Sequence, residues 1–323
     1  MPESTFRRIL PAIGLFFLAP FISEYLLGDF PLTKLGYLMI LAPLYGGGAL
    51  LIREIVRRTE RGWLTILMLA FAYAVLEEAF TTQTLFNPNY LKLNLHLLDP
   101  AYISVLGIGG WWTVFVLTLH TVWSISTSIA LVEVCVPARE TTPWLRWPGL
   151  TLVSVLFALS VVASTRFQIK HNGFVATKMQ FVVSGVVVVA TVIAAFLLPR
   201  RRAGKKASPA PSPWLAGTVA LIAGSLFLIV PRAWAWGAVA IYLAVDIMVI
   251  FVVAGMSRRS GWAGKHRLAL ASGAALAYGW HAFLQMPVDG TTGVAIRASN
   301  AVCLLVVLVL IAYAARRQVR YAI

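Results

Sequence analysis

Long apolar runs, each about 20 residues in length, dominate this chain of 323 residues. A helix that rises about 1.5 Å per residue crosses the hydrocarbon core of a bilayer in a run of that length. Hydrophobic residues make up 59% of the chain, and charged residues make up 12%. That charged share is about half the average of roughly 25% for soluble domains. The chain is therefore predicted to be an all-α, polytopic integral membrane protein.

The apolar runs predict about ten transmembrane helices, the first of which is an uncleaved helix rather than a removed leader. They are expected at about 9–27, 37–53, 63–86, 108–134, 148–165, 179–199, 213–230, 235–256, 268–285 and 298–315. With both termini in the cytoplasm, twenty lysines and arginines fall on the inner side and seven on the outer side. This bias follows the positive-inside rule and favours that orientation.

A net charge of +15 is common among nucleic-acid-binding proteins, but in this chain the basic residues lie between the apolar runs. Charges in loops that orient helices explain this distribution better. We therefore expect the lipid bilayer as the partner and exclude nucleic acid. The expected location is the cytoplasmic membrane of a bacterium.

A basic, proline-rich segment at 200–213 divides the chain into two predicted parts. Its composition is typical of a flexible cytoplasmic linker. Residues 1–199 would form an N-terminal membrane part of six helices that carries most of the unusual polar residues. Residues 214–323 would form a C-terminal membrane part of four helices.

Two adjacent carboxylates, Glu77 and Glu78, lie inside the third apolar run. A charged side chain at that depth costs roughly 2.5–3.5 kcal/mol on insertion scales, so it marks a functional site by default. In an ideal helix the two side chains point about 100° apart. Glu77 would then face a cavity as the base of a catalytic centre, while a neighbouring helix would hold Glu78 in support.

His120 lies in the middle of the fourth apolar run. Counted from the outer ends of their helices, Glu77 and His120 are each about nine residues deep, which corresponds to roughly 13 Å. Antiparallel neighbouring helices would place them at one level. Ser124 follows His120 by one helical turn and shares its face, so we expect it to support the histidine.

Other polar residues are candidates for supporting roles on the outer side of the membrane. They are Glu24 at the end of the first helix, His96 in the loop 87–107 and His281 near the end of the ninth helix. Asp246 is expected to form a hydrogen bond to a neighbouring helix. Glu133 is expected in water at the cytoplasmic end.

The pair Glu77-Glu78 and the stretch from His120 to Ser124 resemble motifs of the membrane-embedded CAAX protease and bacteriocin-processing family. The first family motif is Glu-Glu-x-x-x-Arg, and Thr82 stands at its arginine position here. Ser124 stands where the family commonly has asparagine, and His96 would supply the second motif's histidine. The resemblance covers about residues 63–135. It implies cleavage of peptides within the membrane by a water that a glutamate and two histidines activate.

The sequence thus predicts an intramembrane peptidase or hydrolase that acts on a peptide or lipidated peptide. Glu77, His120 and one of His96 or His281 would form a His₂Glu set like those that bind catalytic zinc, so a divalent metal is a candidate cofactor. Two alternatives stay open. One is a transporter coupled to protons or cations, and the other is a non-enzymatic assembly protein in which the polar residues only specify helix packing.

Overall fold

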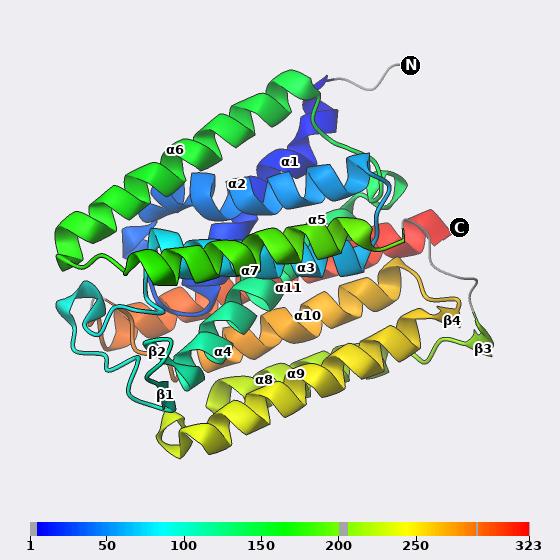
Figure 1. The fold of residues 1–323 in the computed structure, drawn as a ribbon. Helices are drawn as coiled ribbons and strands as arrows, with labels where there is room; N and C mark the ends of the chain where they lie inside the picture. The colour runs from blue at the N-terminus through cyan, green and yellow to red at the C-terminus, as the bar shows by residue number, and fades with distance from the viewer. Residues whose placement is uncertain (1–4, 200–205, 289, 323) are drawn as a thin grey trace.

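A computed structural model describes residues 5–199, 206–288 and 290–322. In that part of the chain ten helical segments run between the two ends of one bundle (Figure 1). Their bounds are α1 Thr5–Pro20 continued by η1 Phe21–Leu26, α2 Tyr37–Arg58, α3 Trp63–Leu76 continued by η3 Glu77–Thr81, α4 Gly110–Leu119 continued by η5 His120–Thr127 and α5 Ser128–Cys135, α6 Trp147–Asn172, α7 Lys178–Leu197, α8 Pro213–Ile229, α9 Trp236–Ser257, α10 Gly264–His281 and α11 Val294–Ala322. Each predicted span corresponds to one of these segments.

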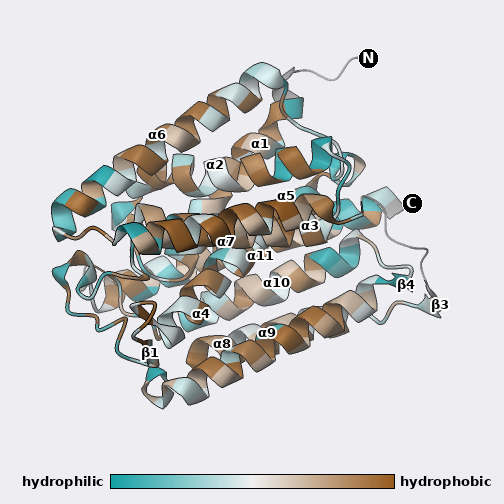
Figure 2. Ribbon diagram, viewed as in Figure 1, coloured by the Kyte–Doolittle hydropathy of each residue, from teal (hydrophilic) through white to brown (hydrophobic). Residues whose placement is uncertain are grey.

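Eight of the segments in the described residues are long and apolar enough to cross a membrane. The other two are α8, which has 17 residues, and α10, whose first turn carries Lys265, His266 and Arg267. The prediction of a polytopic all-α membrane protein is therefore confirmed. The helices α7 and α9 consist mostly of hydrophobic residues (Figure 2). Many of these residues are exposed, as expected for helices in contact with lipid.

The helix α1 begins and the helix α11 ends at the same end of the bundle, which we call the terminal end (Figure 1). A short parallel pair lies there, formed by β3 Lys206–Pro209 and β4 Arg259–Ser260. The opposite end, which we call the hairpin end, carries β1 Tyr102–Ile103 paired with β2 Ile108–Gly109. Two termini at one end agree with an even number of spans. The cytoplasmic orientation of that end stays a prediction.

Three-residue 3-10 turns complete the connections between the helices. They are η2 Leu32–Lys34, η4 Tyr90–Lys92, η6 Pro137–Arg139 and η7 Arg232–Trp234. Local sequence ends or starts several helices. Gly173 closes α6 in the left-handed conformation, with a φ of 68°. The Thr177 side chain accepts a hydrogen bond from the Gln180 backbone N–H and caps the start of α7.

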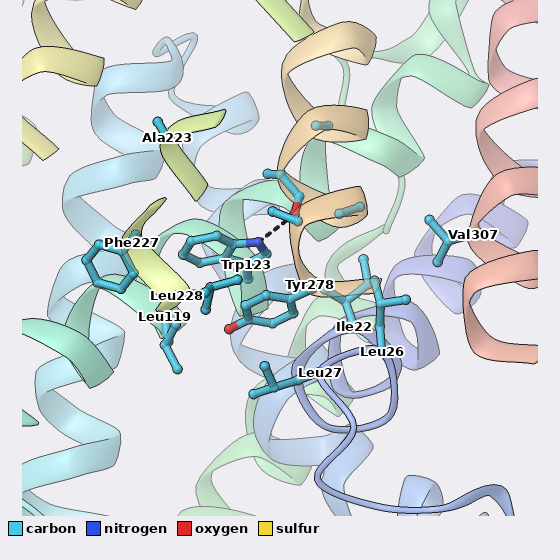
Figure 3. Packing of buried hydrophobic residues seen from close by; sticks show 14 of the residues in the cluster. Ile22, Leu26, Leu27, Leu119, Trp123, Ala223, Phe227, Leu228, Tyr278 and Val307 are labelled. Carbon is cyan, nitrogen blue, oxygen red and sulfur yellow. Dashed lines mark hydrogen bonds between the residues drawn. The ribbon is translucent and has the colours of Figure 1, made fainter. Parts of the chain in front are cut away.

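The largest hydrophobic cluster joins the two predicted parts of the chain. At its centre the ring of Trp123 stacks on that of Tyr278, with centroids 4.6 Å apart and planes 4° from parallel (Figure 3). The Trp123 indole N–H also donates a hydrogen bond to the Ala274 carbonyl oxygen over 2.7 Å. The division into two parts stays a prediction, and this cluster means that the parts share apolar core.

Glycines allow two pairs of helices to approach closely. A Cβ at Gly46 of α2 would overlap the Phe16 carbonyl oxygen of α1, and a Cβ at Gly273 of α10 would overlap the Gly217 carbonyl oxygen of α8. Small residues at such contacts are typical of helix packing in membranes, where backbones gain dispersion contacts by close approach. The first contact holds α1 against α2 and so helps to position the residues of η1.

A buried network of ion pairs joins α2 to α5 near the terminal end. Arg57 binds both carboxylate oxygens of Glu133, through Nη2 at 2.6 Å and Nε at 2.7 Å. Arg53 binds Glu133 at 3.1 Å and Glu54 at 2.7 Å. The expectation that Glu133 lies in water is wrong, since the residue is 1% exposed. Its charge is compensated because two arginines one turn apart on α2 face it.

Candidate functional site

Three helices that meet in the half of the bundle toward the hairpin end each contain a π-helical turn. These turns are η1, which carries Glu24, η3, which carries Glu77 and Glu78, and η5, which starts at His120. In η3 the Thr82 backbone N–H donates to the Glu77 carbonyl oxygen over 2.8 Å, five residues back. A π-helical turn widens the helix by one residue and frequently occurs at functional sites. Here three of them contribute residues to one polar centre.

Glu78 and His120 form the shortest contact of this centre that is not made by a hydroxyl. The Nε2 atom of His120 lies 2.8 Å from Glu78 Oε1. The other oxygen of Glu78 accepts hydrogen bonds from the hydroxyl groups of Thr82, at 3.3 Å, and Thr84. The Trp112 indole N–H in turn donates to the Thr84 hydroxyl over 2.9 Å. Both oxygens of the Glu78 carboxylate are thus held by neighbouring side chains.

The carboxyl group of Glu77 faces the other ring nitrogen of His120, Nδ1. Its Oε2 atom is 3.4 Å from Nδ1, and the Ser124 hydroxyl is 3.2 Å from the same nitrogen. Glu77 is 1% exposed, and Oε2 has no hydrogen-bond partner among the described residues. Glu77 therefore keeps a free acceptor, whereas the acceptors of Glu78 are occupied.

The structure therefore places both carboxylates on one imidazole. A neighbouring helix holds Glu78, as expected, but the expectation that the two carboxylates point about 100° apart assumed regular α-helical spacing. The widened turn η3 starts at Glu77, so the 100° angle of an ideal helix does not apply from there on.

Two tyrosines and a third carboxylate border the centre. The ring of Tyr45 stacks on that of His120 with centroids 5.8 Å apart, and the ring of Tyr73 lies edge-on at 6.4 Å. The side chain of Tyr45 lies next to the carboxyl groups of both Glu24 and Glu77. Glu24 is half-buried, whereas Glu77 is buried. Glu24 is thus the member of the group that is most open to the surroundings.

The centre offers a set of metal ligands. One donor atom from each of Glu77, Glu78 and His120 lies within 4.8 Å of the other two. Two carboxylates and an imidazole are ligands that zinc accepts, and catalytic zinc sites use three protein ligands and an open position. The unpartnered Oε2 atom of Glu77 fits such a role. The residues present thus suit a divalent metal, which would supply Lewis-acid activation of a bound water.

The other two predicted histidines lie elsewhere. His96 is exposed in the loop near the hairpin end, where its Nδ1 atom pairs with Asp99 Oδ2 at 2.9 Å. His281 ends α10 beside Trp280, with ring centroids 6.0 Å apart. Neither belongs to the group of donors around His120, so the described residues do not form the expected His₂Glu set. The donor set has two carboxylates and one histidine.

Sequence reasoning gave Tyr45, Thr84 and Trp112 no role in the site. Tyr45 directly precedes Gly46-Gly47-Gly48, the glycines that let α2 pack closely. This position next to the glycines is the sequence feature from which a role for Tyr45 could have been predicted. Regular helical spacing would place Thr84 on the face of Glu77, but Thr84 lies beyond the end of η3 and its hydroxyl bonds to Glu78. Trp112 lies in the first turn of α4. Asp246, as expected, bonds to a neighbouring helix, since the Thr118 hydroxyl donates to it over 2.9 Å.

The bundle and its centre define an integral membrane protein with a buried cluster of glutamates around one histidine. The chain belongs to an uncharacterised membrane protein family, whose model matches residues 14–320. Comparison with curated proteins and with solved structures gives no match.

Proposed function

We propose that this protein is an intramembrane hydrolase that cleaves peptide bonds, with Glu77, Glu78 and His120 as its catalytic centre. The observation that carries the proposal is the pair of contacts on His120, with Glu78 on Nε2 and Glu77 on Nδ1. The resemblance of Glu77-Glu78 and His120 to motifs of the CAAX protease and bacteriocin-processing family supports the same assignment. That family has an arginine at the position of Thr82. In this chain the hydroxyl groups of Thr82 and Thr84 donate hydrogen bonds to Glu78 instead.

The different environments of the two carboxylates support different roles. Glu78 accepts hydrogen bonds from two threonines and contacts His120, so it orients the imidazole. Glu77 has a free oxygen at the same ring, which suits a general base that takes a proton from water. The water oxygen would then attack the carbonyl carbon of the peptide. Protonated His120 would give a proton to the leaving amine as the peptide C–N bond breaks, and the proton that Glu77 took from the water would then return to His120.

The buried ion-pair network between the centre and the terminal end favours a hydrolase over a transporter. On α2 the ion-paired Arg53 follows Tyr45 by eight residues, which is about 12 Å along the helix. Arg53, Glu54 and Glu133 are at most 1% exposed and are engaged in ion pairs with one another. A transporter needs access from both sides in turn, whereas a hydrolase needs access from one side only.

Peptide cleavage by the purified protein tests this proposal. The protein is reconstituted in lipid nanodiscs and incubated with a library of peptides, including lipidated ones, and the products are identified by mass spectrometry. We expect defined cleavage products that are lost in Glu77→Gln and His120→Ala. Asp246→Asn removes another carboxylate within the membrane and is the matched control that should keep the products. An identical product set from the wild type and from both site variants would overturn the proposal.

A further inference from the structure

Four carboxyl groups near the centre lack a lysine or arginine partner in a chain that is otherwise strongly basic. Glu24, Asp29, Glu77 and Glu78 form no ion pair with a lysine or arginine in the described part of the chain. By contrast, arginines pair with Glu54, Glu133 and Glu140 at the terminal end. The net charge of the chain is +15, so a group of four acidic side chains without a lysine or arginine partner contrasts with the rest of the protein.

Glu24 and Asp29 form what we call the acidic entrance, on the side of the hairpin end. Both are half-buried, whereas Glu77 and Glu78 are buried. The Glu24 carbonyl oxygen accepts hydrogen bonds from the backbone N–H groups of Asp29, at 2.9 Å, and Phe30, at 3.2 Å. This turn needs the positive φ of 94° at Gly28, which favours glycine. The local backbone thus fixes the two carboxyl groups near each other.

The entrance is continuous with the catalytic centre. Tyr45 lies next to both Glu24 and Glu77, and its ring stacks on His120. At the inner end of this series Glu77 is 1% exposed and has a carboxylate oxygen without a hydrogen-bond partner. A buried acceptor without a good hydrogen bond is costly, and this atom, whose nearest ring nitrogen is His120 Nδ1 at 3.4 Å, can accept a further donor from a ligand.

We propose that the acidic entrance binds a cationic group of the substrate, an ammonium or a guanidinium, beside the bond that is cleaved. This substrate class rests on the proposed hydrolase function. Binding of the cation can nevertheless be measured without catalysis. Charge complementarity carries it, because carboxylates in a partly dehydrated site attract cations more strongly than carboxylates in water do.

The spacing of the acids favours an organic cation at the entrance over a metal ion. The donors that could share one metal are those of Glu77, Glu78 and His120, and neither Glu24 nor Asp29 belongs to that set. A guanidinium or an ammonium presents several N–H donors and can bind carboxylates that lie apart. A metal could thus occupy the inner set without filling the entrance.

A pair of probes that differ in charge tests the proposal. The cation p-aminobenzamidine and its neutral relative p-aminobenzamide are titrated onto the full-length protein in nanodiscs, and empty nanodiscs correct for partition into lipid. We expect saturable binding of the cation and at least about tenfold weaker binding of the neutral probe. Glu24→Gln and Asp29→Asn should each weaken binding of the cation, while Asp246→Asn and His96→Ala should not. Zinc added to the wild type should leave most of this binding intact.

Three outcomes would overturn the proposal: equal binding of the two probes, unchanged binding in both entrance variants, or complete displacement of the cation by zinc. These results do not depend on cleavage, so they are distinguishable from a failure of the proposed function. In the cleavage assay, an active protein should prefer peptides with arginine or lysine near the cleaved bond. Glu24→Gln should reduce that preference. The same variant should cleave peptides with a neutral residue at that position as fast as the wild type does.

Discussion

The imidazole of His120 lies between two glutamates that are adjacent in sequence, with Glu78 at 2.8 Å from Nε2 and Glu77 at 3.4 Å from Nδ1. The contact crosses from η5 to η3, so it also ties two membrane helices together. Because all three side chains are at most 8% exposed, water does not satisfy their polar atoms. Glu78 and His120 depend on partners that the protein supplies, whereas Oε2 of Glu77 has no hydrogen-bond partner among the described residues.

Glu78→Gln should cost less stability than Glu78→Leu. The amide oxygen of glutamine can still accept a hydrogen bond from Thr82 or Thr84, whereas leucine leaves both hydroxyls and His120 without this partner. An unsatisfied buried polar group costs about 1–3 kcal/mol. Thermal unfolding of both variants in one detergent is the measurement. Equal melting temperatures would mean that Glu78 does not serve as the shared acceptor.

Glu133→Gln should strongly reduce stability, because it leaves Arg53 and Arg57 buried with less compensating charge. Breaking a buried ion pair typically costs about 3–5 kcal/mol. Glu140→Gln is the matched control, since Glu140 pairs with Arg267 in a partly exposed position and should cost much less. The stability of the two variants is measured by unfolding them in increasing concentrations of a denaturing detergent. Similar losses in both variants would contradict the buried network.

Gly46→Ala should disrupt the contact between α1 and α2, because a Cβ at this position overlaps the Phe16 carbonyl oxygen. Gly14→Ala, within α1, is the control, since a Cβ there has nothing within 4 Å. Alanine favours a helix over glycine by about 1 kcal/mol, so the control should be neutral or slightly stabilising. Expression level and melting temperature report the difference. Two variants that behave alike would show that α1 does not pack on α2 in this way.

The spans and the depth of the polar residues could be predicted from the sequence, because hydrophobicity alone determines them. The level shared by Glu77 and His120 follows from counting residues along two antiparallel helices. The direction of Glu78 could not be predicted, since the π-helical turn at Glu77 depends on contacts between helices.

The error on Glu133 has a similar origin. Its position near the end of an apolar run suggested contact with water, but its arginine partners lie about 80 residues earlier in the chain. The sequence alone does not show which helices are neighbours. His96 was grouped with the centre by motif spacing, and its loop instead runs along the surface near the hairpin end, where it pairs with Asp99.

Burial raises the pKa of Asp29 to about 6, and the hydrogen bond from Gln285 opposes this shift only in part. A carboxyl group whose pKa is higher in the folded state stabilises the fold below its unfolded pKa of about 3.9, and this stabilisation is lost as the pH rises through about 6. Asp29→Asn should therefore gain melting temperature relative to the wild type as the pH rises from about 5 to about 7.5. A difference that does not change with pH would place Asp29 in water.

The incorporation of oxygen from water tests the central claim most directly. A peptide that the wild type cleaves is incubated with the protein in water enriched in oxygen-18, and the newly formed carboxyl terminus is analysed by mass spectrometry. The account predicts that this terminus carries one oxygen-18 atom and that Glu77→Gln, although folded, forms none of it. Cleavage by Glu77→Gln at the wild-type rate, or a product without the heavy oxygen, would contradict the claim that Glu77 activates a water.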